Sequence, residues 1–200
     1  MNTMTRTELQ KELIVRGFSE KGAAPNKTMS LKEEELSVVS VGDLLDQLMS
    51  RHERIFRSMG FATGEEAKPF WDDLAAAIDA IKAIIQRAAD ELEPLHHEST
   101  VSQPRAPSMS SKVKDELQKE LIARGYAADG HAPQGSMWLV EDFLRSVQLV
   151  ELIDTLFSRR EKLFRMVEEE GMEPSRPSYD DVSIAVEALK VVVSHLFGDD

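Results

Sequence analysis

The sequence predicts an all-α fold made of two copies of one helical unit. Apolar residues recur every three to four positions through most of both halves, which is the period of an amphipathic helix. The phrase ELQKELIVRGF, from Glu8 to Phe18, returns as ELQKELIARGY, from Glu116 to Tyr126. The same offset of 108 positions holds for 50 consecutive pairs, of which 25 are identical. A constant offset at that level of identity predicts a tandem duplication.

The repeated phrase predicts a short helix at the start of each unit. Leu9 and Leu13 fall on one face, and Gly17 or Gly125 follows the last basic residue. Glycine readily takes the left-handed conformation that closes a helix, and an apolar residue just beyond it commonly packs back onto the helix. Phe18 and its counterpart in the second copy are expected to do so.

A long helix is predicted next, from about Leu31 to Met59, with its copy 108 positions later. Leucine, valine and isoleucine keep one broad apolar face throughout this stretch. We expect a break near Val41 and Gly42 in the first copy only, because Val150 stands where the first copy has Gly42.

A third helix is predicted to begin after Pro69 or Pro177. The aspartate pairs at 72–73 and 180–181 suit the positive end of a helix. Valines at 191–193 allow a strand by propensity, but the period of the surrounding apolar stripe favours a helix.

Each unit is thus expected to be a short helix plus a long antiparallel helical hairpin. The intervening segment is rich in proline and serine and has no apolar period, so it predicts a flexible linker. The predicted domains are residues 5–92, 93–112 and 113–198. The two units either fold as independent domains or pack against each other, within one chain or in a homo-oligomer.

Composition narrows the function classes. The formal net charge of −12 opposes binding to nucleic acid or to anionic membranes, because both rest on clustered Lys and Arg. No stretch is apolar for long enough to span a membrane, and there are no cysteines for a disulfide, a thiolate metal site or a nucleophile. We therefore expect a cytoplasmic protein without a cofactor.

Two acidic pairs are the candidate metal ligands. Asp43 with Asp46, and Glu151 with Asp154, have the i, i+3 spacing that places two carboxylates on one helical face. This spacing resembles half of the metal site of all-α nucleotide pyrophosphohydrolases, which hold a divalent metal between two acidic pairs on facing helices. The matching second pair is missing, so a solvated helix face is the favoured interpretation.

The five histidines have no histidine counterpart 108 positions away, so no catalytic residue is assigned, although His52 on the long helix remains a candidate base. A cationic cluster does recur, either as ion-paired helix surface or as a patch for an acidic partner. Trp138, whose counterpart is Ser30, is either a partner-binding residue or part of the core. The predicted partner-binding residues are Arg51, Arg54, Arg57, Arg159, Lys162, Arg165 and Trp138.

Two short stretches resemble known families. TELQKELIVRGFSEKG, from Thr7 to Gly22, resembles the first helix and turn of the SAP motif, a two-helix module, and this resemblance implies DNA binding. LLDQLMSR, from Leu44 to Arg51, is similar to a segment of gas-vesicle accessory proteins, which implies a role in assembly.

Taken together, these features favour a non-catalytic adaptor, scaffold or assembly factor that presents two related units to protein partners. A small metal-dependent helical enzyme, a gas-vesicle-accessory-like protein and a SAP-like DNA-binding protein are the alternatives.

Overall fold

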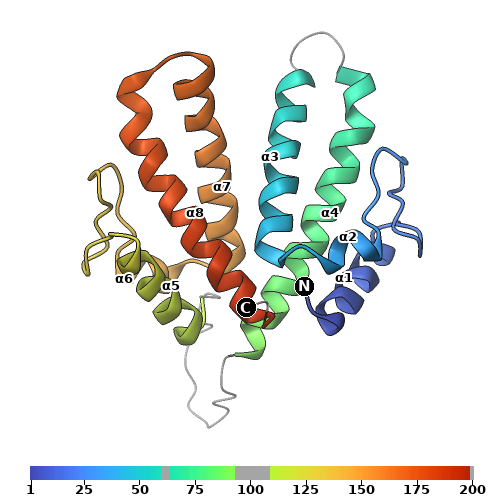
Figure 1. Ribbon diagram of the computed structural model, residues 1–200, viewed down its shortest axis with the longest axis horizontal. Helices are drawn as coiled ribbons and strands as arrows, with labels where there is room; N and C mark the ends of the chain where they lie inside the picture. The colour runs from blue at the N-terminus through green and yellow to red at the C-terminus, as the bar shows by residue number, and fades with distance from the viewer. Residues whose placement is uncertain (60–63, 93–108, 199–200) are drawn as a thin grey trace, which may run out of the picture. The chain divides into compact units, whose positions relative to one another are not determined.

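The computed structural model describes residues 1–59, 64–92 and 109–198, and in these residues the fold is all-α (Figure 1). The only β pairing in this part of the chain consists of two isolated bridges, Ala23 with Ser30 and His131 with Trp138. Most of the predicted linker, residues 93–112, lies outside the described residues. In chain order the α-helices are α1 (Thr3–Val15), α2 (Glu33–Ser37), α3 (Val41–Met59), α4 (Gly64–Glu91), α5 (Ser111–Ala123), α6 (Glu141–Ser146), α7 (Leu149–Phe164) and α8 (Arg176–Leu196).

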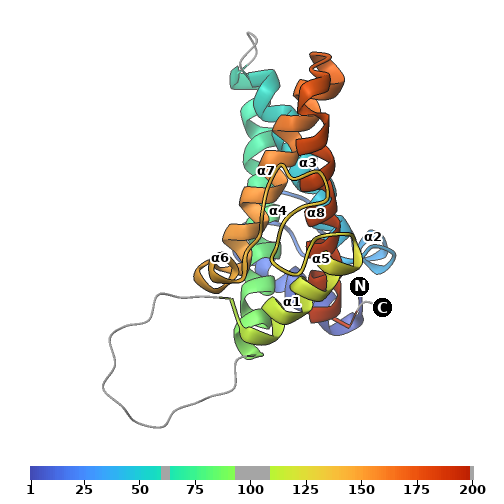
Figure 2. The ribbon, with the colours of Figure 1, turned by 90° about the vertical axis from the view of Figure 1, so that its left-hand side faces the viewer.

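The chain forms two compact units. Unit 1 comprises residues 1–85 and 193–200, and unit 2 comprises residues 86–192. In unit 1, α3 and α4 lie side by side, with α1 and α2 near one end (Figure 1). In unit 2, α7 and α8 form the corresponding hairpin (Figures 1 and 2). The last residues of α4 and of α8 therefore fall in a different unit from the rest of their helix.

The short helices end as predicted. Gly17 and Gly125 have φ values of 91° and 98°. The next residue in each case, Phe18 or Tyr126, is buried, and its N–H donates to the carbonyl oxygen five residues earlier over 3.0 Å. This is the Schellman arrangement, in which a left-handed glycine satisfies the last carbonyls of the helix.

The predicted helix from Leu31 to Met59 is divided into α2 and α3, and the break lies directly before Val41, close to where it was expected. The expectation that only the first copy breaks is wrong. The second copy breaks at the corresponding place, between α6 and α7. In each copy the carbonyl at the break accepts a hydrogen bond from a distant N–H: Met1 to Val39 over 2.9 Å, and Met109 to Val147 over 3.0 Å. In both copies the chain is thus tied at the break to a residue far away in the sequence.

A new helix then starts with its own cap. Ser40 precedes α3, and the Asp43 N–H donates to its hydroxyl over 3.0 Å. Gln148 precedes α7, and its N–H donates to the Glu151 carboxylate over 3.3 Å. Such contacts satisfy N–H groups that lack a partner within the first helical turn.

The connection between α7 and α8 is a short π-helix, η1 (Arg165–Glu169), followed by a 3-10 turn, η2 (Glu173–Ser175). The valines at 191–193 are helical, as predicted. Leucine, isoleucine and valine side chains make up most of the buried core. Among the described helices, none is both long enough and apolar enough to cross a membrane.

Candidate functional site

The loop between the first two helices of each unit closes on itself. In unit 2 the Leu139 N–H donates to the Gly130 carbonyl over 2.9 Å, and the Leu31 N–H makes the same bond to Gly22 in unit 1. Both glycines have positive φ, 91° and 83°, and a Cβ at either would overlap the carbonyl of the facing leucine. The close backbone approach therefore requires glycine at both positions.

A buried carboxylate holds each loop onto the helical hairpin. Asp73 of α4 is fully buried and accepts four hydrogen bonds, from the backbone N–H and the side chain of Asn26 and of Thr28, at 2.7 to 3.1 Å. Asp181 of α8 is fully buried and accepts three, from the Gln134 N–H and from the N–H and hydroxyl of Ser136, at 2.7 to 2.9 Å.

These aspartates do not have the role expected from the sequence. We predicted both aspartate pairs at the start of a helix, where they would interact with the helix dipole. Helix α4 instead starts at Gly64, which places Asp73 well inside the helix, whereas α8 starts at Arg176, close to the predicted position. Burial favours the neutral acid, but the hydrogen bonds from Asn26 and Thr28 outweigh it and hold the pKa of Asp73 below its ordinary value.

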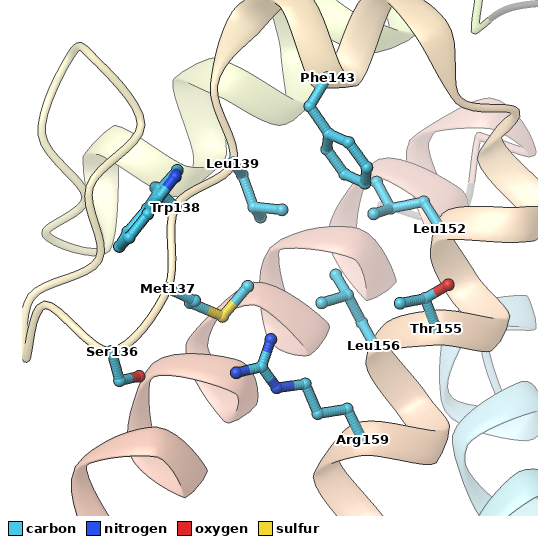
Figure 3. A pocket seen from close by; sticks show the side chains of 9 residues that line it. All are labelled: Ser136, Met137, Trp138, Leu139, Phe143, Leu152, Thr155, Leu156 and Arg159. Atoms are coloured by element: carbon cyan, nitrogen blue, oxygen red, sulfur yellow. The ribbon is translucent and has the colours of Figure 1, made fainter.

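A groove opens beside the anchored loop in unit 2. It has a volume of about 300 Å³ and lies between residues 136–139 of the loop, Phe143 of α6 and one face of α7. In Figure 3 the side chains of Met137, Leu139, Phe143 and Leu156 point toward a common space. The lining residues are Ser136, Met137, Trp138, Leu139, Phe143, Leu152, Thr155, Leu156 and Arg159.

The floor of the groove is apolar, and its edge carries one cation. Met137, Leu139, Leu152 and Leu156 are buried, whereas Phe143 is 41% exposed. Arg159 is exposed, and no ion pair to its guanidinium occurs among the side chains that the structure describes.

The two lining hydroxyls already have partners. The Ser136 hydroxyl donates to Asp181 over 2.7 Å, and the Thr155 hydroxyl donates to the Glu151 carbonyl over 2.8 Å. Among the lining side chains of the groove, Arg159 is the only charged hydrogen-bond donor. The groove suits an apolar group that carries negative charge.

Trp138 is exposed rather than part of the core, with 59% of its surface accessible. Its ring lies 5.6 Å from that of His131, centroid to centroid. In Figure 3 its indole projects to the side of the loop opposite to Met137 and Leu139. Trp138 thus adds exposed apolar surface on the side of the loop that faces away from the groove floor.

The corresponding positions of unit 1 share the floor but not the rim. The floor residues and the arginine are identical in type at the positions 108 residues earlier: Met29, Leu31, Leu44, Leu48 and Arg51. The rim positions differ, with Ser30 for Trp138, Glu35 for Phe143 and Gln47 for Thr155. The Glu35 carboxylate accepts a hydrogen bond from the Lys32 N–H over 3.3 Å. Sequence reasoning missed Phe143, although its pairing with Glu35 across the repeat was a usable signal.

The remaining cations of the predicted cluster do not share one environment. Arg54 donates to the Ser50 carbonyl over 3.2 Å, and Lys162 is exposed. Arg165 pairs with Glu170 over 3.2 Å. The side chain of Arg57 lies outside the described residues. Arg159 alone of the predicted cations lines the unit 2 groove.

The predicted acidic pairs lie at helix starts. Asp43 and Glu151 make the capping contacts of α3 and α7 described above, and Asp46 and Asp154 follow one turn later. No group of three or more His, Asp or Glu side chains suited to a metal ion occurs among the described residues.

His52 stacks on Trp71 of α4, with ring centroids 4.8 Å apart. Its Nε2 is buried without a hydrogen-bond partner. Burial lowers the pKa of His52, and the charge of Lys82 lowers it further, against an opposing effect of Asp79. This environment favours the neutral ring packed in the hairpin of unit 1.

Comparisons of the chain with protein-family models, with curated proteins and with solved structures gave no match.

Proposed function

We propose that this chain is a non-catalytic adaptor or scaffold protein, made by tandem duplication of a helical unit, which binds a protein partner through the groove of unit 2. The observation that carries the proposal is the groove itself: an apolar floor, a half-exposed phenylalanine and an arginine in one place. Aromatic residues and arginine are the side chains most enriched among energetically dominant interface residues.

The exposure of these side chains supports a protein partner. Phe143 and Trp138 are 41% and 59% exposed and lie on the same loop-and-helix segment. Single exposed apolar residues are common on protein surfaces, whereas apolar grooves and patches bordered by polar residues often mark interaction sites. The net charge of −12 also disfavours nucleic acids and anionic membranes as the binding partner.

The internal comparison also supports binding. Both copies keep the floor residues, as expected if these residues hold the loop against the hairpin. The exposed positions near the floor have no such task, and two of them change from polar to aromatic, with Phe143 and Trp138 of unit 2 at the positions of Glu35 and Ser30. We propose that the copies share one scaffold and that the rim of unit 2 is specialised for a partner.

The test is affinity capture from a lysate of the source cells with the intact chain and two variants. Phe143→Glu places a charge in the groove. Ile122→Glu is the matched control, because Ile122 is a half-exposed apolar residue of unit 2 outside the groove. The proposal predicts proteins that the wild type and Ile122→Glu capture and Phe143→Glu does not. If no protein is captured reproducibly, or if both variants capture the same set as the wild type, the proposal fails.

A further inference from the structure

We infer that the groove of unit 2 binds one partner segment per chain, and that this segment inserts a large apolar side chain next to an aspartate or glutamate. This inference rests on the proposed function and adds the chemistry of the partner and the stoichiometry. Size, charge and the difference between the two copies each support a part of it.

The size of the groove fits a side-chain anchor. A cavity of roughly 150 Å³ is enough to hold benzene. The groove, at about 300 Å³, has room for one large aliphatic or aromatic side chain and part of its neighbour. It lies at the lower end of the range for small-molecule sites, roughly 300 to 1,000 Å³. The groove is also bordered by exposed side chains, namely Phe143, Thr155 and Arg159, so a segment of polypeptide can pass across it.

The charge of the groove selects an acidic neighbour for that anchor. Arg159 is the only charged residue among the nine lining side chains. A guanidinium beside apolar surface makes strong, directional bonds to a carboxylate, often through two parallel N–H donors. Because the hydroxyls of Ser136 and Thr155 donate within unit 2, a carboxylate gains more here than a neutral polar group does.

The same features argue for a single site per chain. Unit 1 keeps an arginine, Arg51, at the position of Arg159, but has Glu35 in place of Phe143. Glu35 is exposed and acidic, so it removes the apolar wall and repels a carboxylate. The identical floor without the aromatic rim is not expected to retain the segment. Avidity from two equivalent sites, which a duplicated chain would otherwise suggest, is therefore not expected.

The probe for the test is a phage-displayed library of random 16-residue peptides, panned against the intact chain. Enriched peptides are synthesised and titrated by calorimetry. We expect every enriched peptide to contain a large apolar residue and an Asp or Glu within about one helical turn of it. We expect Kd values in the micromolar range. We expect a stoichiometry of one peptide per chain.

Four variants test whether the peptides bind in the groove. Phe143→Glu and Arg159→Glu are each expected to weaken binding at least about tenfold, whereas Ile122→Glu leaves it unchanged. Arg159→Lys keeps the charge but not the paired donors, so it retains part of the affinity. Peptides whose acidic residue is changed to Lys should lose affinity for the wild type and recover it on Arg159→Glu. This reversal cannot come from misfolding of a variant.

Several results would overturn the inference. These are enriched peptides without the apolar and acidic pair, binding that survives both groove variants, two peptides per chain, or failure to enrich any peptide. Self-association of the wild type that Phe143→Glu abolishes would make a second copy the occupant and would also overturn it. Peptides that bind elsewhere would leave the proposed function intact, since lysate capture tests that function separately.

Discussion

At the scale of single residues, the most informative side chains are the two buried aspartates. Asp73 and Asp181 are fully buried carboxylates whose charge is balanced by backbone and side-chain donors of one loop, with no cation among these donors. A buried charge that loses such partners is costly, so the arrangement ties the loop conformation to the hairpin. The floor of the groove is thus fixed by residues outside it.

Asp73→Asn is expected to lower the unfolding free energy of unit 1 by about 2 to 4 kcal/mol. The NH₂ group of the new asparagine side chain is a donor, and it would face the donors of Asn26 and Thr28. Trp71 fluorescence in a Trp138→Phe background reports on unit 1 during urea unfolding. The exposed neighbour substitution Asp72→Asn is the control and is expected to change stability by less than about 0.5 kcal/mol. Equal effects of the two substitutions would contradict the role of Asp73.

The pH dependence of the same carboxylate follows from its lowered pKa. The ionised form is favoured in the folded state, so its contribution is complete above the ordinary Asp value of 3.8 and is lost as the pH falls through the lower folded value. Asp73→Asn should therefore lie closest to the wild type in stability in the most acidic samples. A difference that stays constant down to that pH would contradict this assignment.

His52 predicts a second pH effect at milder acidity. Its folded pKa is lowered from 6.5, so folding favours the neutral ring, and stability is lost as the pH falls below that value. His52→Phe keeps a ring against Trp71 and should flatten the dependence of the unit 1 midpoint between about pH 7.5 and 5.5. The exposed His131→Gln is the control. An unchanged slope in His52→Phe would show that another group is responsible.

At the scale of elements, the glycine-closed loops connect the backbone to the groove. Gly130→Ala combines a positive φ with overlap of Cβ on the Leu139 carbonyl, so we expect a loss of more than about 2 kcal/mol in unit 2. Gly135→Ala also has a positive φ, but no atom lies within 4 Å of its Cβ, so a loss of about 1 kcal/mol is expected. Unfolding monitored by Trp138 fluorescence in a Trp71→Phe background provides the measurement. A larger loss of stability in Gly135→Ala than in Gly130→Ala would contradict the close approach at Gly130.

Elements whose ends depend on local chemistry could be predicted from the sequence. The glycine stops at Gly17 and Gly125 and the helical nature of 191–193 are examples. The break between α2 and α3 was expected from Gly42, but the break between α6 and α7 was not, because Val150 stands at the position of Gly42. At that break Val147 accepts a hydrogen bond from Met109, more than thirty residues away along the chain. The N-cap pattern of Ser40 with Asp43 was present in the sequence but was read only as a carboxylate pair.

At the scale of the whole molecule, the compact units do not coincide with the two halves of the chain. Residues 193–200 belong to unit 1, although the rest of α8 belongs to unit 2. Phe197 is buried, and its carbonyl accepts a hydrogen bond from the Asn2 side chain, which also caps α1. The start and the end of the described chain thus meet within unit 1.

Phe197→Ala is therefore expected to destabilise unit 1 by about 2 to 4 kcal/mol, as is usual when a buried aromatic side chain is removed. Ser194→Ala, at a half-buried position in the last turn of α8, is the control. The change should be seen through Trp71, which lies in unit 1, before it is seen through Trp138. A change seen through Trp138 alone would contradict this assignment of the helix end.

The all-α class followed from the sequence because helical periodicity is a local property. The groove could be predicted only in part: Arg159 and Trp138 were candidates from the repeat, but Phe143 was not. Its position beside Met137 and Leu156 depends on how α6 follows the anchored loop, and this depends in turn on the burial of Asp181. The internal offset does identify the three rim positions that differ between the copies, once the structure shows that they surround one groove.

The most direct measurement is a nuclear magnetic resonance titration of the intact, isotope-labelled chain with a peptide selected for binding. The peptide should shift the amide signals of Ser136 to Leu139, Phe143 and Arg159, and should leave the corresponding signals of Thr28 to Leu31, Glu35 and Arg51 in place. Equal shifts at both sets, or shifts confined to unit 1, would contradict a single docking groove in unit 2.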